Sequence, residues 1–489
     1  MQNQTDFSLK PLSGNLEEDI TRFKEIFAHQ ALFRIRELCC PNFKAAVIFF
    51  DGVADSQMIS ESIIKPLLLF KAQKNDLLQS VYKSGIFSDE AALAQSSEEI
   101  VKAIMYGDTA LLLCGGAIIL NTKGFCTRSI EEPKEERVLQ GPREGFCESV
   151  LKNLSLILRR LTTPNLHLKK MTVGRTSATS VFVCYLDNIV NKKVLGELYR
   201  RLEKIDIDGV LDSNYLCEMI KDHRHSLFKT VGATERPDII AARLLEGRVA
   251  IFVDGTPVVL TVPYLFCENF QSNDDYYLNY MLSSFSRVLR YVCFAISVLV
   301  PALYLALVNY YPQLLPSFFL ITISGARQSM PFSSFLECLL LIFVFHILKE
   351  AGIRMPESMG HALSIVGGLV VGQAAVEAKI ISAPMLIVVA LSGICGLVVS
   401  RLKNAILYLR IIYALAGAAL GLLGLFLAVT LTAAVIFNMS SFLVDYTVYL
   451  RAPSPQGLKD TLVRAPWNKM LTRPLGLSKN RIREKEYEG

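Results

Sequence analysis

The feature that most constrains this chain is a long stretch that is poor in charge. Residues 289–450 carry 13 charged side chains in 162 positions, about 8%, whereas about 25% of the other 327 positions are charged. The second value is ordinary for a soluble domain. The sequence therefore predicts a soluble region followed by a membrane region. This excludes a purely cytosolic enzyme, a disordered chain and a collagen-like chain.

The net charge of +6 is spread unevenly over these regions. Residues 1–288 hold 34 basic and 36 acidic side chains, while the segment from Arg451 onward holds 9 basic and 4 acidic ones. A short basic segment beside a membrane region suits an anionic lipid surface better than a nucleic acid. We therefore expect membrane lipid, and no nucleic acid, as a partner.

The cysteines and the N-terminus indicate a reducing compartment. Eleven cysteines occur without a CxxC pair or a zinc-ligand spacing, so neither a disulfide framework nor a metal site is expected. The opening residues MQNQTDFSLKPLSGNLEED lack the apolar core of a signal peptide. A cytoplasmic N-terminal region is expected.

The first 288 residues show signs of an internal duplication. The runs AVIFFDGVAD and VFVCYLDNIVN are both apolar and both end in an acidic turn. Aligning Asp51 with Asp187 gives an offset of 136 residues. Two further stretches each consist of two apolar runs separated by a turn, at Gly115–Gly116 and at Asp254–Gly255. Each is predicted to form a β-hairpin, because glycine readily adopts the positive φ of tight turns. The two turns are 139 residues apart. Each copy should contain a strand, an acidic turn and a helix, over residues 46–70 and 182–205.

The predicted fold is an α/β cytoplasmic region of two related subdomains followed by an all-α polytopic membrane domain. The charged stretch 131–146 reads as a linker that leads into an amphipathic helix bridging the copies. The expected boundaries are a disordered segment over 1–22, subdomains over 23–140 and 141–284, a transmembrane domain over 285–445 and a basic tail over 446–489.

The charge-poor block contains several apolar segments near the length of about 20 residues that crosses a membrane. Residues 314–326 are too short and read as re-entrant or interfacial; the expected spans cover 291–308, 333–348, 361–376, 384–399 and 411–437. Basic residues at 349, 354, 401 and 403 mark two cytoplasmic loops. The last span would then leave the tail outside, unless it folds back near Gly417, Gly421 and Gly424 or a shorter segment fails to cross. The expected number of spans is four to six.

No catalytic motif is present. GxxxxGK[ST], HExxH and GxSxG are absent, and Asp51, Asp187 and Asp254 occupy turn positions where aspartate is common. The sequence predicts a protein that is not an enzyme and has no cofactor.

The segment GGLVVGQAAVEAK contains the candidate functional residues. Gly368 and Gly372 lie four residues apart and would allow close helix packing. A second stripe would suit a pore, with apolar constrictions followed by a polar, acidic mouth; it comprises Val366, Val370, Gln373 and Glu377. Ordinary helix packing is the alternative.

Two further polar residues lie within the membrane block. A carboxylate such as Glu337 costs at least about 2.5 kcal/mol at membrane depth unless it is paired or hydrated. Arg327 is a possible partner, and a position near the interface is the alternative.

Five motifs carry a family resemblance; they are GPREGFCESVLKNLSLILRRLTTPNL, VGRTSATSVFVCYLDNIVN, ERPDIIAARLLEGRVAIFVDGTPVVLTVPYLFCENFQSNDDYY, GGLVVGQAAVEAKIISAP and LKDTLVRAPWNKM. Together, over about residues 141–470, they closely resemble the A subunit of GerA-type spore germination nutrient receptors. The first 140 residues match more loosely, and SSFLVDYTVYLRAPSP departs from the usual Gly- and Pro-rich link.

The resemblance implies a multi-pass protein of the spore inner membrane that works with a transporter-like B subunit and a lipoprotein C subunit. It also implies self-association into a ring that releases monovalent cations when the partner subunit senses a germinant. A ligand-gated ion channel subunit is thus the first hypothesis. The alternatives are a secondary transporter, which broken helices would indicate, and a receptor scaffold that does not conduct.

Overall fold

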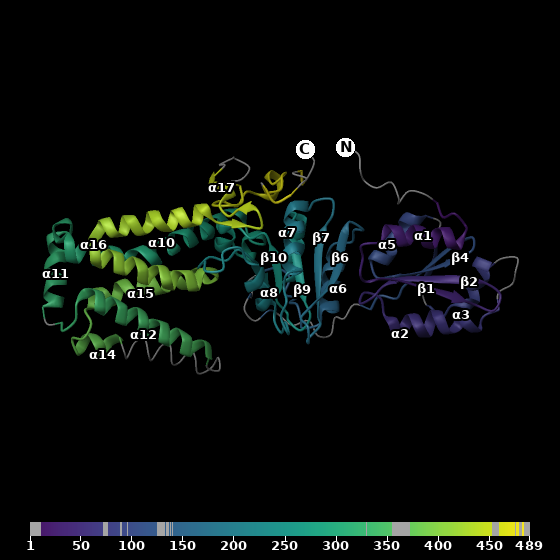
Figure 1. Ribbon diagram of the computed structural model, residues 1–489, viewed down its shortest axis with the longest axis horizontal. Helices are drawn as coiled ribbons and strands as arrows, with labels where there is room; N and C mark the ends of the chain where they lie inside the picture. Colours follow the sequence, from purple (N-terminus) through teal and green to yellow (C-terminus); the bar gives the residue numbers. More distant parts are fainter. Residues whose placement is uncertain are drawn as a thin grey trace.

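Three structural regions lie in a row along the molecule (Figure 1). A first α/β subdomain lies at one end, a second α/β subdomain in the middle and a helical bundle at the other end. The computed structural model describes residues 11–71, 77–88, 90–94, 96–124, 133, 136, 138, 140–328, 330–354, 372–451, 459–474, 476–478 and 482–483.

The first subdomain is a five-stranded antiparallel sheet in the order β1-β2-β4-β5-β3. Its elements are α1 (Leu16–Ile26), β1 (Phe33–Cys39), β2 (Lys44–Phe50), α2 (Ser56–Met58), the π-helix η1 (Ile59–Ile64), α3 (Lys65–Leu69), α4 (Leu77–Ser80), the π-helix η2 (Val81–Gly85), β3 (Ala91–Ala94), α5 (Ser97–Met105), β4 (Thr109–Leu113) and β5 (Gly116–Leu120).

The second subdomain repeats this topology in the order β6-β7-β9-β10-β8, also antiparallel. Its elements are α6 (Val150–Arg160), β6 (Leu166–Val173), β7 (Thr179–Leu186), α7 (Lys192–Leu202), α8 (Ser213–Ile220), β8 (Gly232–Thr234), α9 (Pro237–Leu245), β9 (Val249–Val253) and β10 (Val259–Val262). Strand for strand the two sheets have the same order, as the duplication predicts. The exact subdomain boundaries stay a prediction.

The predicted strand, turn and helix are present in both copies, and capping residues explain where the helices begin. The Asp55 carboxylate accepts from the N–H groups of Gln57 and Met58 at the start of α2, and the Asn191 amide oxygen accepts from Lys193 at the start of α7. One hairpin turn lies at Asp254–Gly255 as predicted, while the other lies at Cys114–Gly115, one residue earlier than predicted.

Strand residues alternate between two cores, because successive side chains point to opposite faces of a sheet. In β2, Ala46 and Ile48 face α1 and α5, while Ala45 and Val47 face η1 and α3. In β7, Phe182 and Cys184 lie in the same inner core as Ala46, while Val181 and Val183 face α7 and α8.

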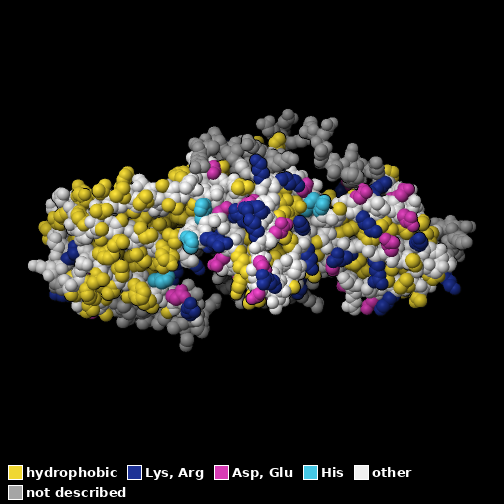
Figure 2. Space-filling model, viewed as in Figure 1, with side chains coloured by type: hydrophobic (Ala, Val, Ile, Leu, Met, Phe, Trp, Pro, Cys, Tyr) yellow, Lys and Arg dark blue, Asp and Glu magenta, His cyan; other side chains and the backbone are white. Residues whose placement is uncertain are grey.

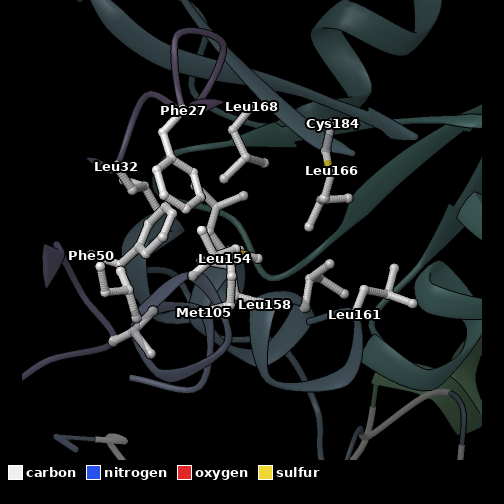
Figure 3. Close-up of a cluster of buried hydrophobic side chains, with 14 of the residues drawn as sticks. Phe27, Leu32, Phe50, Met105, Leu154, Leu158, Leu161, Leu166, Leu168 and Cys184 are labelled. Carbon is white, nitrogen blue, oxygen red and sulfur yellow. The ribbon is translucent and has the colours of Figure 1, made fainter. Parts of the chain in front are cut away.

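The inner core is shared by the two subdomains (Figure 3). Phe27 and Phe50 of the first copy contact the same buried cluster as Leu154 and Leu168 of the second. The backbones also meet, since the Ala31 N–H donates to the Leu168 carbonyl at 3.1 Å and the Leu168 N–H donates to the His29 carbonyl at 3.1 Å. Leu154 lies on α6, so the helix expected to bridge the copies contributes to this common core.

The expected disorder over residues 1–22 is wrong for residues 16–22, which belong to α1. Asn15 caps this helix, and Leu16, Ile20 and Phe23 are buried against the sheet. The polar, acidic composition of the segment masked an amphipathic pattern with three apolar residues on one face.

The helical bundle begins after the 3₁₀ turns η3 (Phe266–Phe270) and η4 (Asn273–Tyr276). Its elements are α10 (Tyr280–Tyr310), η5 (Pro312–Leu314), α11 (Ser317–Arg327), α12 (Ser334–Arg354), α14 (Gly372–Glu377), α15 (Ala383–Val398), η7 (Ser400–Leu402) and α16 (Lys403–Asn438), followed by β11 (Ser440–Ser441), β12 (Val444–Asp445), α17 (Val448–Arg451) and η8 (Trp467–Lys469).

Hydrophobic side chains cover the visible face of this bundle, whereas charged side chains are interspersed over the α/β regions (Figure 2). Within the described residues, two helical segments are long and apolar enough to cross a membrane, namely α10 and residues 400–438; α15 is a shorter apolar helix. The number of spans, predicted as four to six, therefore stays a prediction.

Candidate functional site

The bundle is organised around α10, which starts at Tyr280, five residues before the start of the transmembrane domain predicted over 285–445. Asn279 caps the helix through a hydrogen bond from the Met281 N–H at 2.9 Å, and the helix then continues for 31 residues. Close approach by α16 requires glycine, because a Cβ at Gly417 would lie 2.6 Å from the carbonyl oxygen of Ala302. α10 and α16 therefore pack closely against each other.

α16 folds back on itself at Gly421, one of the two alternatives left open by the sequence. Gly421 has φ 64° and ψ −141°, a conformation outside the helical region. A Cβ at Gly424 would clash with the carbonyl of Ala416, although residues eight apart are about 12 Å apart along a straight helix. The Tyr310 hydroxyl donates to the Ala419 carbonyl at 2.7 Å, so the turn lies beside the far end of α10.

Both ends of α16 consequently lie beside the second subdomain. Just before the helix, Arg401 donates to the Glu268 carbonyl at 2.9 Å. Just after it, the Ser441 hydroxyl donates to the Thr230 carbonyl at 2.7 Å. The hairpin returns the chain to the α/β region, while the membrane side of the tail stays a prediction.

A buried arginine inside the bundle was not singled out from the sequence. The Arg410 guanidinium donates to the carbonyl of Ser297 at 3.0 Å and to the carbonyl of Ser392 at 2.9 Å, linking α10, α15 and α16. Gly396 leaves room for it, since a Cβ there would lie 3.1 Å from its Nη2. Its isolation in an apolar run was the available signal, because a charged residue at membrane depth is costly and tends to be functional.

Glu337 is buried in the bundle, but its partner is not the predicted Arg327. Its carboxylate accepts hydrogen bonds from the N–H and the hydroxyl of Ser382, the residue that precedes α15. No ion pair joins Glu337 to Arg327 within the described chain; Arg327 ends α11, where it is partly exposed. The N-terminus of a helix favours a nearby negative charge, which explains how a carboxylate is accommodated here.

The predicted pore stripe lies only partly within the described residues. Gln373 and Glu377 are exposed on α14, and the Gln373 amide donates to the Glu377 carboxylate at 3.0 Å. Gly372 belongs to α14, and a Cβ there would make ordinary contact with Leu386 at 3.7 Å. Val366, Val370 and Gly368 lie outside the described residues, so their roles stay predictions.

A buried ionic cluster joins the N-terminal end of α10, here called its root, to the chain from residue 446 onward, here called the C-terminal segment. Arg287 is fully buried and donates to Asp275 at 3.2 Å and to the Asp460 carboxylate at 2.9 Å. Arg290 also binds Asp275, at 2.8 Å. The Tyr276 hydroxyl donates to Asp460 at 3.0 Å, and burial followed by the Asp460 charge raises the pKa of Tyr276 well above its ordinary value.

The chain does not pass from β10 into α10 as one continuous helix. η3 and η4 precede α10, and the junction is stiffened by ion pairs rather than by one helix. The C-terminal segment is also no separate tail in its described part, since Val448 and Leu477 pack against the second subdomain. Asp460 and Arg287 are 173 residues apart, so local sequence patterns gave no signal of their pairing.

Comparison with known proteins decides the family. The family model described as "Bacillus/Clostridium GerA spore germination protein" matches residues 21–475. The chain belongs to the GerA family. A GerA relative, spore germination protein KA of Bacillus subtilis, is 38% identical over 96% of this chain and 88% of its own length. Spore germination protein GerLA of Bacillus cereus is 34% identical over 98% of this chain and 99% of its own.

A solved GerA structure is also similar in sequence. The N-terminal domain of the A subunit of the Bacillus megaterium germinant receptor GerK3 is 32% identical and covers 53% of this chain and 98% of that one, with a TM-score of 0.42. The resemblance stated from the five motifs is thus confirmed at the level of the germinant receptor A-subunit family.

Proposed function

We propose that this GerA-family chain is the membrane subunit of a spore germination nutrient receptor and that a ring of copies forms a gated pathway for monovalent cations. It would be a non-enzymatic, multi-pass protein of the spore inner membrane. A transporter-like B subunit would sense the germinant, and a lipoprotein C subunit would complete the receptor.

The exposed pair Gln373 and Glu377 is the observation that carries the pore proposal. Polar side chains exposed on an apolar bundle are costly against lipid but suit a water-filled lumen shared between copies. In a ring, Glu377 would supply one carboxylate per copy and favour cations. The apolar gate would be formed by Val366 and Val370.

The distribution of charge supports a cytoplasmic α/β region. Lys349 and Lys403 line one small cavity of about 100 Å³, together with Arg410, at the end of the bundle where α16 begins. Arg401 contacts Glu268 at the same end. Basic residues gathered on the α/β side agree with the positive-inside rule.

The test is reconstitution of the purified chain in planar bilayers. We expect discrete ohmic, cation-selective currents. Glu377→Gln should lower cation preference with little effect on gating, because it removes a charge and changes little volume. Glu350→Gln is a matched control, since Glu350 is an exposed carboxylate paired with Arg354.

The gate has its own test in spores. Val370→Ala should cause leak, because a smaller side chain widens a dewetted constriction. Simple packing predicts instead a void worth about 1 to 3 kcal/mol of stability and no leak. Dormant Val370→Ala spores together with unaltered selectivity in Glu377→Gln would move the pathway to another helix, first of all the one that carries Glu337.

A secondary transporter is the second candidate, favoured by the environment of Glu337. Its carboxylate meets the N-terminus of α15 inside the bundle, as at the interrupted helices of transporters. Saturable flux coupled to a ligand and lost in Glu337→Gln would establish this alternative. If neither currents nor ligand-coupled flux were detected, the chain would be a receptor scaffold that does not conduct.

A further inference from the structure

A cavity of about 460 Å³ lies where the second subdomain, the root of α10 and the C-terminal segment meet. Its walls include α9 of the subdomain, Tyr276 before α10, Arg401 before α16 and Trp467 of the C-terminal segment. The volume falls within the range of about 300–1,000 Å³ that is typical of small-molecule sites. The cavity is separate from Gln373, Glu377 and Glu337, on which the pore proposal rests.

The described walls of the cavity carry more positive than negative charge. Five arginines line it, at positions 243, 248, 401, 473 and 483, against the three carboxylates Asp238, Glu246 and Glu268. This leaves an excess of two positive charges. Two of these charges also have partners outside the lining: Asp238 is bound by Arg236, at 2.9 Å, and Arg401 lies 3.7 Å from Glu136.

One buried N–H donor among the described cavity residues, on Arg248, has no hydrogen-bond partner. Glu268 is buried between Arg243, at 3.4 Å, and Arg248, while Arg401 donates to the Glu268 backbone carbonyl. Arg248 is 4% exposed, and its Nε–H is buried without a hydrogen-bond partner. An unpaired donor on a buried cation is costly, so a further acceptor is expected.

The electrostatics of Arg243 point the same way. Burial lowers the pKa of its guanidinium, Glu268 opposes this change, and the positive charges of Arg248 and Arg401 add to it. A bound anion would relieve this repulsion. Apolar and aromatic side chains, including Ile239, Leu245 and Trp467, complete the walls beside the arginines.

We propose that this cavity binds a small organic anion that carries a phosphate monoester group, with an apolar or aromatic body against Trp467. A phosphate monoester bears a charge of about −1.5 to −2 at pH 7, which matches the excess of two positive charges. Arginine also recognises phosphate through paired N–H donors. A ligand here contacts the subdomain, the root of the bundle and the C-terminal segment at once, so its occupancy holds the three together.

Isothermal titration of the full chain in phosphatidylcholine nanodiscs tests the site, with phenyl phosphate as the probe and phenol as its neutral counterpart. Saturable binding of phenyl phosphate at one site per chain is expected, and no saturable binding of phenol. Arg248→Gln and Arg473→Gln should each weaken binding at least tenfold, and Trp467→Ala should weaken it less. Arg175→Gln is the control, since Arg175 is an exposed arginine paired with Asp206.

Several outcomes would overturn the proposal. They are no saturable binding of phenyl phosphate, equal binding of phenol, or an unchanged affinity in Arg473→Gln. The last variant keeps the test open if Arg248→Gln fails to fold, because Arg473 lies in the C-terminal segment and not in the subdomain core. Nanodiscs containing phosphatidic acid identify the source: competition assigns the site to a lipid headgroup, and unchanged binding assigns it to a soluble phosphate.

Discussion

The two α/β subdomains share one sheet order but differ in what covers their outer faces. In the first copy this face packs against helices η1 and α3 of the same copy. In the second copy it packs against α7 and α8 and also against Phe442, Val444 and Leu477, which follow the bundle in the chain. The two copies are thus similar modules, and the second is anchored to segments that follow the helical bundle.

The difference extends to the ionic contacts. Arg287 of α10 is buried against Asp275 and Asp460 at the base of the second copy, whereas the first copy meets the second through the apolar core around Leu154. The first copy is therefore held by packing, and the second is held to the bundle by charge as well.

The largest effect is expected from Arg287→Ala. It leaves Asp275 buried without one of its two cations, and breaking a buried ion pair in this way costs about 3–5 kcal/mol. Denaturant unfolding of the full chain in detergent measures the loss. Arg175→Ala, which breaks an exposed pair, should lower stability far less. Equal losses in the two variants would show that the buried cluster around Arg287 contributes no more than a surface ion pair.

Leu154→Ala tests the core that the copies share. Removing this fully buried side chain should cost about 2–5 kcal/mol and weaken both copies in one transition. The control is Leu151→Ala on the same helix, where the side chain is 39% exposed. Amide hydrogen exchange in Leu154→Ala measures the loss of protection in each copy separately. Faster exchange confined to the second copy would contradict a common core.

Gly421→Ala tests the hairpin that brings the chain back to the second copy. An alanine at φ 64° and ψ −141° should cost about 1–3 kcal/mol and would also press on Tyr310 and Tyr311. Gly325→Ala in α11 is the control, because a Cβ there meets nothing within 4 Å. Thermal unfolding in detergent compares them, and an unaffected Gly421→Ala protein would argue for a straight helix.

The smallest effect concerns the acid sensitivity of α7, the helix that packs in the same core as Phe442. Hydrogen bonds from Arg200, assisted by Arg201, lower the pKa of Glu197 from 4.5 to about 2. A carboxyl whose pKa is depressed on folding contributes stability above pH 4.5 and loses it as the pH falls toward 2.

Glu197→Gln should therefore lower stability at pH 7 and flatten the loss between pH 4.5 and pH 2, as read from unfolding free energies across that range. Glu61→Gln is the matched control in the first copy, where Glu61 accepts from the Gln57 amide. An identical pH profile for the wild type and Glu197→Gln would show that this carboxylate does not link folding to protons.

The duplication could be predicted from sequence because its signals are local. Alternating apolar residues and turn residues such as Asp55 and Gly255 act over a few positions. The fold-back at Gly421 could only be offered as an alternative, because glycine permits a turn without requiring one. The pairing of Arg287 with Asp460 and the docking of Phe442 depend on contacts between distant segments, which no periodic pattern encodes.

The candidate site was predictable to a lesser degree. The cost of burying Glu337 identified it as a special residue, but the choice of Ser382 over Arg327 depends on how α12 and α15 pack. Arg410 could have been identified by the same argument. Gln373 and Glu377 are exposed, the apolar half of the stripe lies outside the described residues, and the pore role of all four residues stays a prediction.

The most direct test of the account is whether the second copy and the bundle act as one unit through α10. A flexible Gly-Ser insertion after Ser284 should leave the protein folded and at normal abundance but abolish the nutrient response of spores. The same insertion in the hairpin turn at Gly115, which lies in the first copy, should leave that response intact. A normal nutrient response after the Ser284 insertion would contradict the account.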